Sequence, residues 1–209
     1  MEELMNQILE DRGIKYLVHF TQAENLYSIF RYGLLPRTDL MEKNIESYFN
    51  FKSRKYHDAI ALSIEFPDYV QFNSIRFRQH NLPWVILLID ASILASKKCA
   101  FSPMKGSPLS YGENAFLQLF DEVDDQVSRK ELKLDSKYPT TVQSKVLCYD
   151  EIPVEYIKEV HFEDRSNYFI YKGTIPTSCK TTVKICQTYF QNRNDYEYWK
   201  INNYKRLPE

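Results

Sequence analysis

The hydrophobic positions of this chain fall into short blocks that alternate between helical and strand spacing. The first block predicts a helix over residues 2–11, with Leu4, Ile8 and Leu9 facing inward. Gly13 is placed to end this helix in a left-handed conformation, and residues 16–20 then predict a short strand. Short helices interleaved with short strands favour an α+β fold.

The clearest helix signal comes next, between residues 21 and 33. Thr21 and Glu24 have the T-x-x-E spacing of a capping box, and Gly33 stands where the helix should end. The apolar residues between them share one helical face: Leu26, Ile29 and Phe30. We therefore expect a strand, a capped helix and a glycine stop in direct succession.

The rest of the chain continues this alternation. Residues 37–58 are polar and basic and predict a long surface loop, whereas residues 66–81 are rich in aromatic and basic side chains. Further strands are expected at 59–64, 84–90, 143–149, 168–171 and 181–190, and helical segments after Asp90, at 113–120, after Pro153 and from Asp195. No repeat or Gly/Ser linker divides the sequence, so we expect a single α+β domain over residues 1–209.

Composition narrows the possible function classes. Only five of the 209 residues are glycine, and none has the spacing of a G-x-G-x-x-G turn or of a P-loop. The usual Rossmann and P-loop nucleotide sites are therefore excluded. The chain carries 16 Tyr, 13 Phe and two Trp; most of these rings should fill the core, while some can stack on a flat ligand such as a nucleobase.

The balance of charged residues and the spacing of the cysteines indicate how the chain can bind nucleic acid and in which compartment it is expected. With 27 basic and 28 acidic residues, the chain cannot bind nucleic acid through global positive charge, although residues 31–106 are locally basic. The four cysteines form no C-x-x-C pair, and the opening stretch MEELMNQILED lacks the regions of a secretory leader. The longest apolar run, residues 84–89, is too short to cross a bilayer. We expect a cytoplasmic protein with free thiols.

Histidines offer one candidate site and no metal centre. The four histidines have no neighbouring cysteine, so no metal is expected. His19 ends the predicted strand just before the capping box, where its ring can face a cleft beside a helix N-terminus. The simpler alternative is a packed, hydrogen-bonded histidine.

A series of blocks gives the sequence a family resemblance. The segment YLVHFTQAENLYSIFRYGLLPR has an H-F-T…N-L…I…G-L pattern, followed in order by HDAIALSIEFPDY, WVILLIDASIL, CAFSP and YPTTVQSKVLCYDEIPVEYIKEV. Together they resemble the DarT family of DNA ADP-ribosyltransferase toxins over residues 12–162. The resemblance implies an ADP-ribosyltransferase-like fold, in which a split, mainly antiparallel sheet with peripheral helices surrounds a cleft that holds NAD in the family. Residues 163–209 would be a C-terminal extension packed on this core.

The resemblance also assigns residues. His19 and Thr21 match the family's motif facing the nicotinamide ribose, Asn25 matches its supporting helix, and Arg76 falls near an arginine that contacts phosphate or the target base. The main departure is Lys145, which replaces the glutamate of the family's Q-A-E-V-L. A second departure is Met104-Lys105-Gly106-Ser107, which replaces a stretch of small residues.

This lysine changes the expected chemistry. In ADP-ribosyl transfer a carboxylate holds a ribose hydroxyl and supports the developing positive centre, whereas an ammonium has no acceptor and the wrong charge. A lysine amine can instead attack C1′ of a sugar. Our leading hypothesis is cleavage of the N-glycosidic bond of a DNA base, leaving an abasic site and needing no cofactor. Lys145 would act as nucleophile or charge partner, with Gln143 beside it and Glu65, Asp68 or Glu151 assisting. The competing interpretation is that Lys145 points to solvent.

DNA should reach such a site as a single strand or with a flipped base. The rings of Tyr69 and Phe72 would stack on the base beside Arg76, with Asp68 and Arg78 close by. Lys52, Arg54 and Lys55 of the polar loop would add a basic DNA-binding surface. A basic aromatic run at residues 196–206 is a second candidate surface, although packing of a helix through Trp199 explains it more simply.

Three functions follow from this pattern. The first is defence against phage by excision of a modified base in phage DNA, such as glucosylated hydroxymethylcytosine. The second is NAD-dependent ADP-ribosylation of DNA, with the missing carboxylate supplied from elsewhere in the chain. The third is a catalytically inactive nucleic-acid-binding module.

Overall fold

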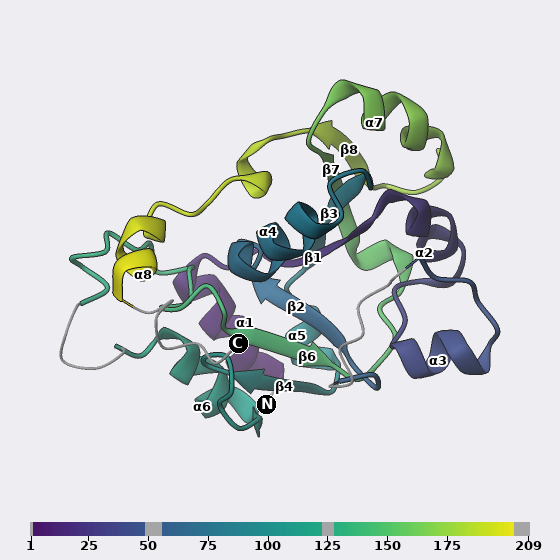
Figure 1. Cartoon of the computed structure of the whole chain (residues 1–209). Helices are drawn as coiled ribbons and strands as arrows, with labels where there is room; N and C mark the ends of the chain where they lie inside the picture. The colour runs from purple at the N-terminus through teal and green to yellow at the C-terminus, as the bar shows by residue number, and fades with distance from the viewer. Residues whose placement is uncertain (1, 49–55, 123–127, 203–209) are drawn as a thin grey trace.

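A single eight-stranded sheet forms the centre of the computed structural model, which describes residues 2–48, 56–122 and 128–202 (Figure 1). The strands are Tyr16–Gln22 (β1), Ile60–Ile64 (β2), Trp84–Asp90 (β3), Cys99–Ser102 (β4), Ser110–Tyr111 (β5), Lys145–Cys148 (β6), Ile157–Phe162 (β7) and Thr182–Ile185 (β8). They are ordered β5-β4-β6-β2-β1-β3-β7-β8, and all neighbours are antiparallel except β7 and β8. The predicted α+β fold with a mainly antiparallel sheet is confirmed.

Short helices surround the sheet. The α-helices are Glu2–Arg12 (α1), Leu26–Tyr32 (α2), Arg37–Glu42 (α3), Tyr69–Arg78 (α4), Ile93–Ser96 (α5), Gly112–Leu117 (α6), Arg165–Tyr171 (α7) and Tyr196–Asn202 (α8). The 3-10 turns are Ala23–Asn25 (η1), Gln118–Phe120 (η2), Val154–Tyr156 (η3), Lys172–Thr174 (η4) and Thr188–Phe190 (η5).

Alternating side chains divide the sheet into two faces. One face carries the larger core, which buries residues of α1, α2, α5 and α6. The other face is covered in part by α4, whose Phe72 and Ile75 pack on Val18, Ile86 and Leu88. In Figure 1, α4 lies on the near side of the sheet and α1 and α5 lie behind it. Each face therefore has its own apolar layer.

The sheet opens between β1 and β2. These strands share only two residue pairs, Leu17 with Ile64 and Val18 with Ser63. Beyond them β1 continues to pair with β3 as far as Gln22, while β2 pairs with β6 from Leu62 back to Ile60. Since each strand keeps its outer partner, the two halves of the sheet diverge at His19, which gives the expected split.

Two details of the first helices differ from the prediction. In α1, Met5 is buried with Ile8 and Leu9, whereas Leu4 is 55% exposed, because positions 5, 8 and 9 share the helical face. The predicted capping box is wrong: Thr21 belongs to β1, and α2 follows the turn η1 without a side-chain cap. The glycine stop is confirmed, since Gly33 ends α2 with a φ of +84°.

Elsewhere, helices replace predicted strand or loop. Residues 168–171 lie in α7, where Asp164 caps the helix by accepting from the backbone N–H of Asn167 at 2.9 Å. The aromatic and basic segment forms α4, capped by Asp68, which accepts from the backbone N–H of Gln71 at 3.0 Å. The loop predicted at 37–58 contains α3, and its residues 49–55 lie outside the described part of the chain. Local capping by aspartate explains α4 and α7.

The C-terminal segment returns to the loop that precedes β6. The buried guanidinium of Arg193 donates to the carbonyl oxygens of Pro139 and Thr140 at 3.1 and 3.3 Å. Asp195 accepts from Arg193 and from the indole N–H of Trp199. This segment therefore holds the entry to the strand that begins with Lys145.

Candidate functional site

Part of the α4 face of the sheet is uncovered where β1 and β2 part. In β2, Ala61 is exposed although Ile60 and Leu62 on either side are buried, and β2 is a central strand. Across the opening, Nδ1 of His19 lies 3.0 Å from the carbonyl oxygen of Ala61. Because a central strand is normally covered on both faces, the exposure of Ala61 marks an uncovered surface at the split.

The contact of His19 fixes the state of its ring. A carbonyl oxygen only accepts, so Nδ1 carries the proton and donates to Ala61, which leaves Nε2 as an acceptor. Burial lowers the pKa of His19, and the bond to Ala61 only partly offsets this effect. The ring is therefore neutral at physiological pH and offers Nε2 to a ligand.

Thr21 and Asn25 form a buried pair beyond His19. The Asn25 Nδ2 donates to the Thr21 hydroxyl at 2.9 Å, and its Oδ1 accepts from the backbone N–H of Tyr48 at 2.8 Å. Both side chains are buried. The structure thus brings His19, Thr21 and Asn25 together at one end of β1, with Asn25 tying that end to α2 and to residue 48.

Lys145 lies against the first turn of α4. Its Nζ donates to Oε1 of Gln71 at 3.1 Å. In β6, Val146 pairs with Leu62 of β2, and the residue after Leu62, Ser63, pairs with Val18 of β1. Lys145 therefore lies at the level at which β1 and β2 part, about 10 Å from β1 at the usual strand spacing.

Asp68 is a buried carboxylate whose charge interacts with that of Lys145, although no ion pair joins their side chains. Its backbone N–H donates to the Ser63 hydroxyl at 3.2 Å and its Oδ1 caps α4, whereas its buried Oδ2 has no hydrogen-bond partner among the described residues. Burial raises the pKa of Asp68, and the positive charge of Lys145 partly offsets this effect. The pair therefore combines an amine with a carboxyl group whose protonated form is favoured by burial.

The other predicted acids lie elsewhere. Oε1 of Glu65 accepts from the backbone N–H groups of Lys15 and Tyr16, at 2.5 and 2.8 Å, which ties it to the start of β1. Glu151 is exposed beyond the far end of β6, 3.8 Å from Lys43. Neither contacts Lys145, so of the three predicted acids only Asp68 has a charge that interacts with that of Lys145. Gln143 lies two residues before Lys145 and is partly exposed.

The expected stacking rings are part of the core. Tyr69 and Phe72 are only 1% and 0% exposed, so neither can stack on a base. Arg76 lies over the rings of Phe72 and Phe190, donates to the Phe190 carbonyl oxygen at 3.1 Å and pairs with Glu163. It therefore fastens the C-terminal segment to α4, and the phosphate or base contact expected of it is corrected.

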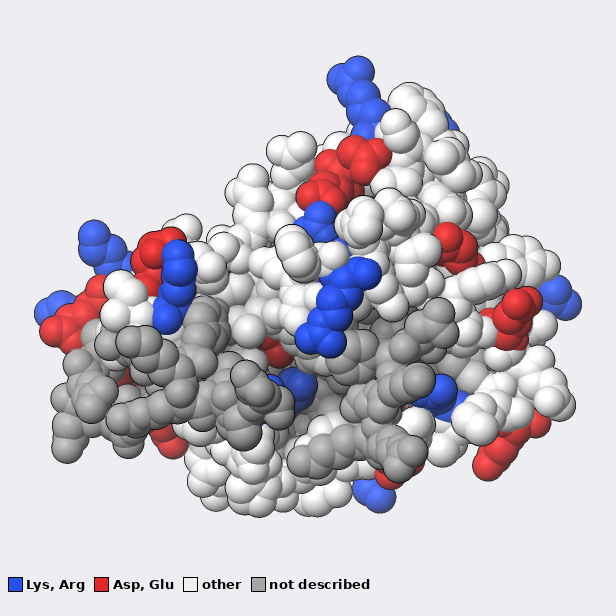
Figure 2. Space-filling model, viewed as in Figure 1, with Lys and Arg blue, Asp and Glu red and all other residues white. Residues whose placement is uncertain are grey.

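The basic residues predicted to bind DNA fall into two groups: one lies on the surface and the others lie outside the described residues. Arg78 is exposed at the end of α4 beside Phe77, which is 86% exposed. Lys52, Arg54 and Lys55 lie outside the described residues. Figure 2 shows basic side chains projecting in the middle of the visible face, where α4 lies in Figure 1.

Gln71 was not predicted as a site residue, although the sequence contains a signal for the helix that positions it. Asp68 and Gln71 have the spacing of a helix cap and a third helical residue, which would have started a helix at Tyr69. That helix places Gln71 in its first turn, toward β6. Ser63 and Ala61 carried no such signal, because their roles depend on strand pairing.

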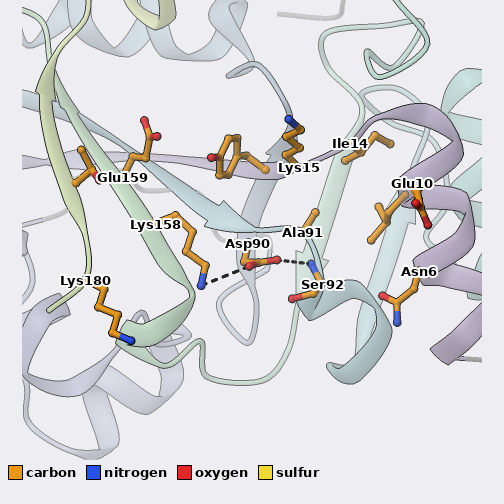
Figure 3. Close-up of a pocket in the computed structure, with 13 residues that line it drawn as sticks. Asn6, Glu10, Ile14, Lys15, Asp90, Ala91, Ser92, Lys158, Glu159 and Lys180 are labelled. Atoms are coloured by element: carbon orange, nitrogen blue, oxygen red, sulfur yellow. Dashed lines mark hydrogen bonds and ion pairs between the residues drawn. The ribbon is translucent and has the colours of Figure 1, made fainter.

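A hollow lies at the opposite end of β1 from the candidate site, beside the end of β3 (Figure 3). Its volume is about 620 Å³, and Lys158 pairs there with Asp90 at 3.4 Å, while Asp90 also accepts from the backbone N–H of Ser92. The wall also contains Asn6, Leu9, Glu10, Ile14, Lys15, Tyr16, Ala91, Glu159, Lys180 and Thr182. Since β1 begins here and His19 lies further along it, this hollow is separate from the candidate site.

Other features concern metals, membranes and thiols. Within residues 2–48, 56–122 and 128–202, no group of three or more His, Cys, Asp or Glu is arranged to hold a metal ion. The same residues contain no helix whose length and apolar character would let it cross a bilayer. All four cysteines are free thiols, and Cys99 and Cys148 face each other on β4 and β6.

Comparison with known proteins places this geometry in context. The family model described as "ssDNA thymidine ADP-ribosyltransferase, DarT" matches residues 18–196. The DarT of Thermus sp. 2.9 in complex with carba-NAD+ is 14% identical with a TM-score of 0.58, over 84% of this chain and 97% of that chain. Its complex with ADP-ribosylated ssDNA gives 14% identity and a TM-score of 0.54, over 85% and 96%.

A further solved relative is the DarTG of Thermosipho africanus in complex with ADP-ribose. It is 13% identical with a TM-score of 0.56 over 86% of this chain, which spans about half (52%) of that chain. Identities at this level show a shared fold. No curated protein sequence matches the chain. Because the family model covers most of the sequence, the chain belongs to the DarT family of ssDNA thymidine ADP-ribosyltransferases.

Proposed function

We propose that the chain acts on a nucleotide of DNA bound where β1 and β2 part, and that it releases the base. The observation that carries the proposal is Lys145, an amine at the place where the family resemblance expects a glutamate. Its contact with Gln71 and the neighbouring Asp68 support a role inside the site rather than in solvent.

The side chains of His19 and Lys145 fit NAD only in part. His19 Nε2 offers an acceptor for an amide or hydroxyl group, which is compatible with such a cofactor. At Lys145 the fit fails, because an ammonium donates hydrogen bonds and cannot accept one from a ribose hydroxyl. We therefore derive no step through NAD and propose a reaction without a cofactor.

The proposed chemistry begins with loss of a proton from the Lys145 ammonium to the Asp68 carboxylate, once the two side chains approach to hydrogen-bond distance or share one water molecule. The free amine attacks C1′ of the deoxyribose, a C–N bond forms, and the bond between C1′ and the base nitrogen breaks with its electron pair on the base. The base takes up the proton from Asp68. Opening of the sugar ring gives an iminium, and water then hydrolyses it, which returns the amine and leaves an abasic site.

Asp68 and Gln71 have distinct parts in this proposal. Burial favours the protonated form of Asp68, so it can hold the proton between the two steps, and Oδ2 is the oxygen that is not engaged in the helix cap. Gln71 accepts from Lys145 through Oε1 and orients the amine without neutralising it. Acid catalysis of this kind contributes about 10²- to 10⁴-fold.

The substrate class is the part of the proposal that depends on biology. A defence enzyme must distinguish foreign DNA from that of its host, and a modified base achieves this at the point of cleavage. We propose glucosylated hydroxymethylcytosine in single-stranded or locally opened phage DNA as the first substrate to test.

NAD-dependent ADP-ribosylation of DNA is the second candidate. Family membership favours it, and Asp68 is a carboxylate beside Lys145 whose Oδ2 could replace the missing glutamate. Under this alternative, the product carries added mass and the base stays attached to the sugar. The third possibility, an inactive binding module, gives binding without either product.

One product assay separates these functions. The protein is incubated with unmodified and modified oligonucleotides, with and without NAD, and abasic sites and oligonucleotide mass are measured. Abasic sites without NAD support base excision, whereas a mass gain that requires NAD contradicts it. Lys145→Ala should abolish base release, and Lys180→Ala, which changes a lysine of the separate hollow, should leave it unchanged.

A further inference from the structure

Tyr111 of β5 and Tyr149, which follows β6, form a stacked pair on the surface. Their ring centroids are 6.5 Å apart and their planes differ by 28°. Tyr111 is 58% exposed and Tyr149 is partly exposed, although both belong to the end of a sheet rather than to a long loop. The pair therefore presents aromatic surface at the β5 edge of the sheet.

Strand pairing places this pair on the same face as Lys145. Side chains alternate along β6, so Lys145, Leu147 and Tyr149 point to one side. Tyr111 pairs with Ala100, and Ala100 pairs with Leu147, so Tyr111 shares that side. The four residue steps from Lys145 to Tyr149 span about 13 Å, which equals about four stacked base steps.

The surroundings of the pair suit a nucleic acid. The Nζ of Lys98, an exposed side chain, lies 5.4 Å from the centre of the Tyr149 ring. The phenol of Tyr149 is neutral at physiological pH, and burial, together with Tyr111 and the nearby Asp58, raises its pKa further, to about 12. Aromatic faces and cations are the groups with which proteins bind single strands without reading sequence.

We propose that Tyr111 and Tyr149 form a stacking platform for a base that flanks the target nucleotide, with Lys98 beside the backbone phosphate. The identity of the partner as single-stranded DNA rests on the proposed function. Under this proposal the bound strand extends from the target nucleotide beside Lys145 to the exposed ring of Tyr111, which is 58% exposed.

Binding measurements test the platform apart from catalysis. Fluorescence anisotropy is recorded for a labelled 12-nucleotide single strand and for a labelled trinucleotide. Tyr111→Ala should weaken binding of the 12-mer about 5- to 150-fold and leave the weaker binding of the trinucleotide unchanged. Tyr111→Phe should retain wild-type binding, because it keeps the ring, and Tyr32→Ala removes an exposed tyrosine of α2 as a matched control.

Salt dependence separates stacking from charge. Lys98→Ala should reduce the slope of log K against log salt by about 0.7, the value for one phosphate contact on a single strand, whereas Tyr111→Ala should leave the slope unchanged. Thermal unfolding confirms that each variant is folded.

The platform is overturned if folded Tyr111→Ala binds the 12-mer within twofold of wild type, if the trinucleotide loses as much affinity, or if wild type binds neither oligonucleotide. Failure of the proposed function has a different signature. In that case wild type releases no base, yet the 12-mer still loses affinity in Tyr111→Ala.

Discussion

Replacing Asp195 by alanine should destabilise the protein strongly, because it leaves the buried guanidinium of Arg193 without a counter-charge. The two side chains are 5% and 0% exposed, and Asp195 accepts from Arg193 through both oxygens, at 2.7 and 2.5 Å. It also accepts from the indole N–H of Trp199 at 2.5 Å. One substitution therefore removes the acceptor for three donors in a buried region.

The size of the effect follows from this burial. Removing one partner of a buried ion pair costs about 3–5 kcal/mol, compared with a total stability of about 5–15 kcal/mol for a typical domain. For a chain of 150–250 residues, 1 kcal/mol shifts Tm by about 2–4 °C, so we expect Tm to fall by about 6–20 °C. Because Arg193 also holds the Pro139 and Thr140 carbonyls, the loop before β6 should loosen as well.

The assay is urea unfolding followed by tryptophan fluorescence, since Trp199 is buried against the mutated site. Glu197→Ala is the matched control on α8, because the Glu197 and Lys200 side chains are exposed and 4.0 Å apart. That variant should change stability by less than about 0.5 kcal/mol. A loss of less than about 1 kcal/mol in Asp195→Ala would refute the assigned role of the buried pair.

Three further predictions concern the backbone, pH and the site. Gly33→Ala should cost about 1–3 kcal/mol in thermal unfolding, because φ is +84° and a Cβ would lie 2.9 Å from the Ile152 carbonyl oxygen; an unchanged Tm would contradict this. Burial lowers the pKa of His161, with Glu159 partly offsetting it, so the unfolded chain binds more protons below about pH 6.5 and stability should fall on acidification. His161→Gln should flatten the Tm difference between pH 7.5 and 5.5, and an equal pH dependence would contradict the assignment. Burial raises the pKa of Asp68, so its charge disfavours folding at pH 7; Asp68→Asn should keep or raise Tm while lowering base release about 100-fold or more, and full activity would exclude Asp68 from proton transfer.

Much of the fold could be predicted where a local pattern dominates. The continuous apolar run of β3 is buried at every position except Asp90, so its strand assignment depended on no other element. Gly13 has the positive φ predicted for it, and Gly33 ends α2 as predicted, also with a positive φ. Thr21 was assigned wrongly because β1 stays paired with β3 as far as Gln22, and the Thr21 hydroxyl accepts from the Asn25 side chain instead of from a helix N–H.

The site was less predictable because it depends on pairing between distant strands. Lys145 meets Gln71 only because β6 lies next to β2 and α4 crosses above them, at a sequence separation of 74 residues. Arginine is a residue type that often binds ligands, yet the guanidinium of Arg76 pairs with Glu163 and donates to the Phe190 carbonyl oxygen. Sequence alone therefore identified the unusual lysine and included Asp68 among three candidate acids, but it neither selected Asp68 nor found Gln71.

The central claim is that the Lys145 amine forms a covalent bond with the sugar, and borohydride trapping tests it most directly. Reduction of the proposed iminium should leave the protein linked to DNA, and peptide mapping should locate the linkage at Lys145. Lys145→Arg keeps the charge but not a nucleophilic amine, so it should give no adduct, whereas Lys105→Ala should still be trapped. Base release with no trapped adduct, or an adduct on another residue, would contradict the account.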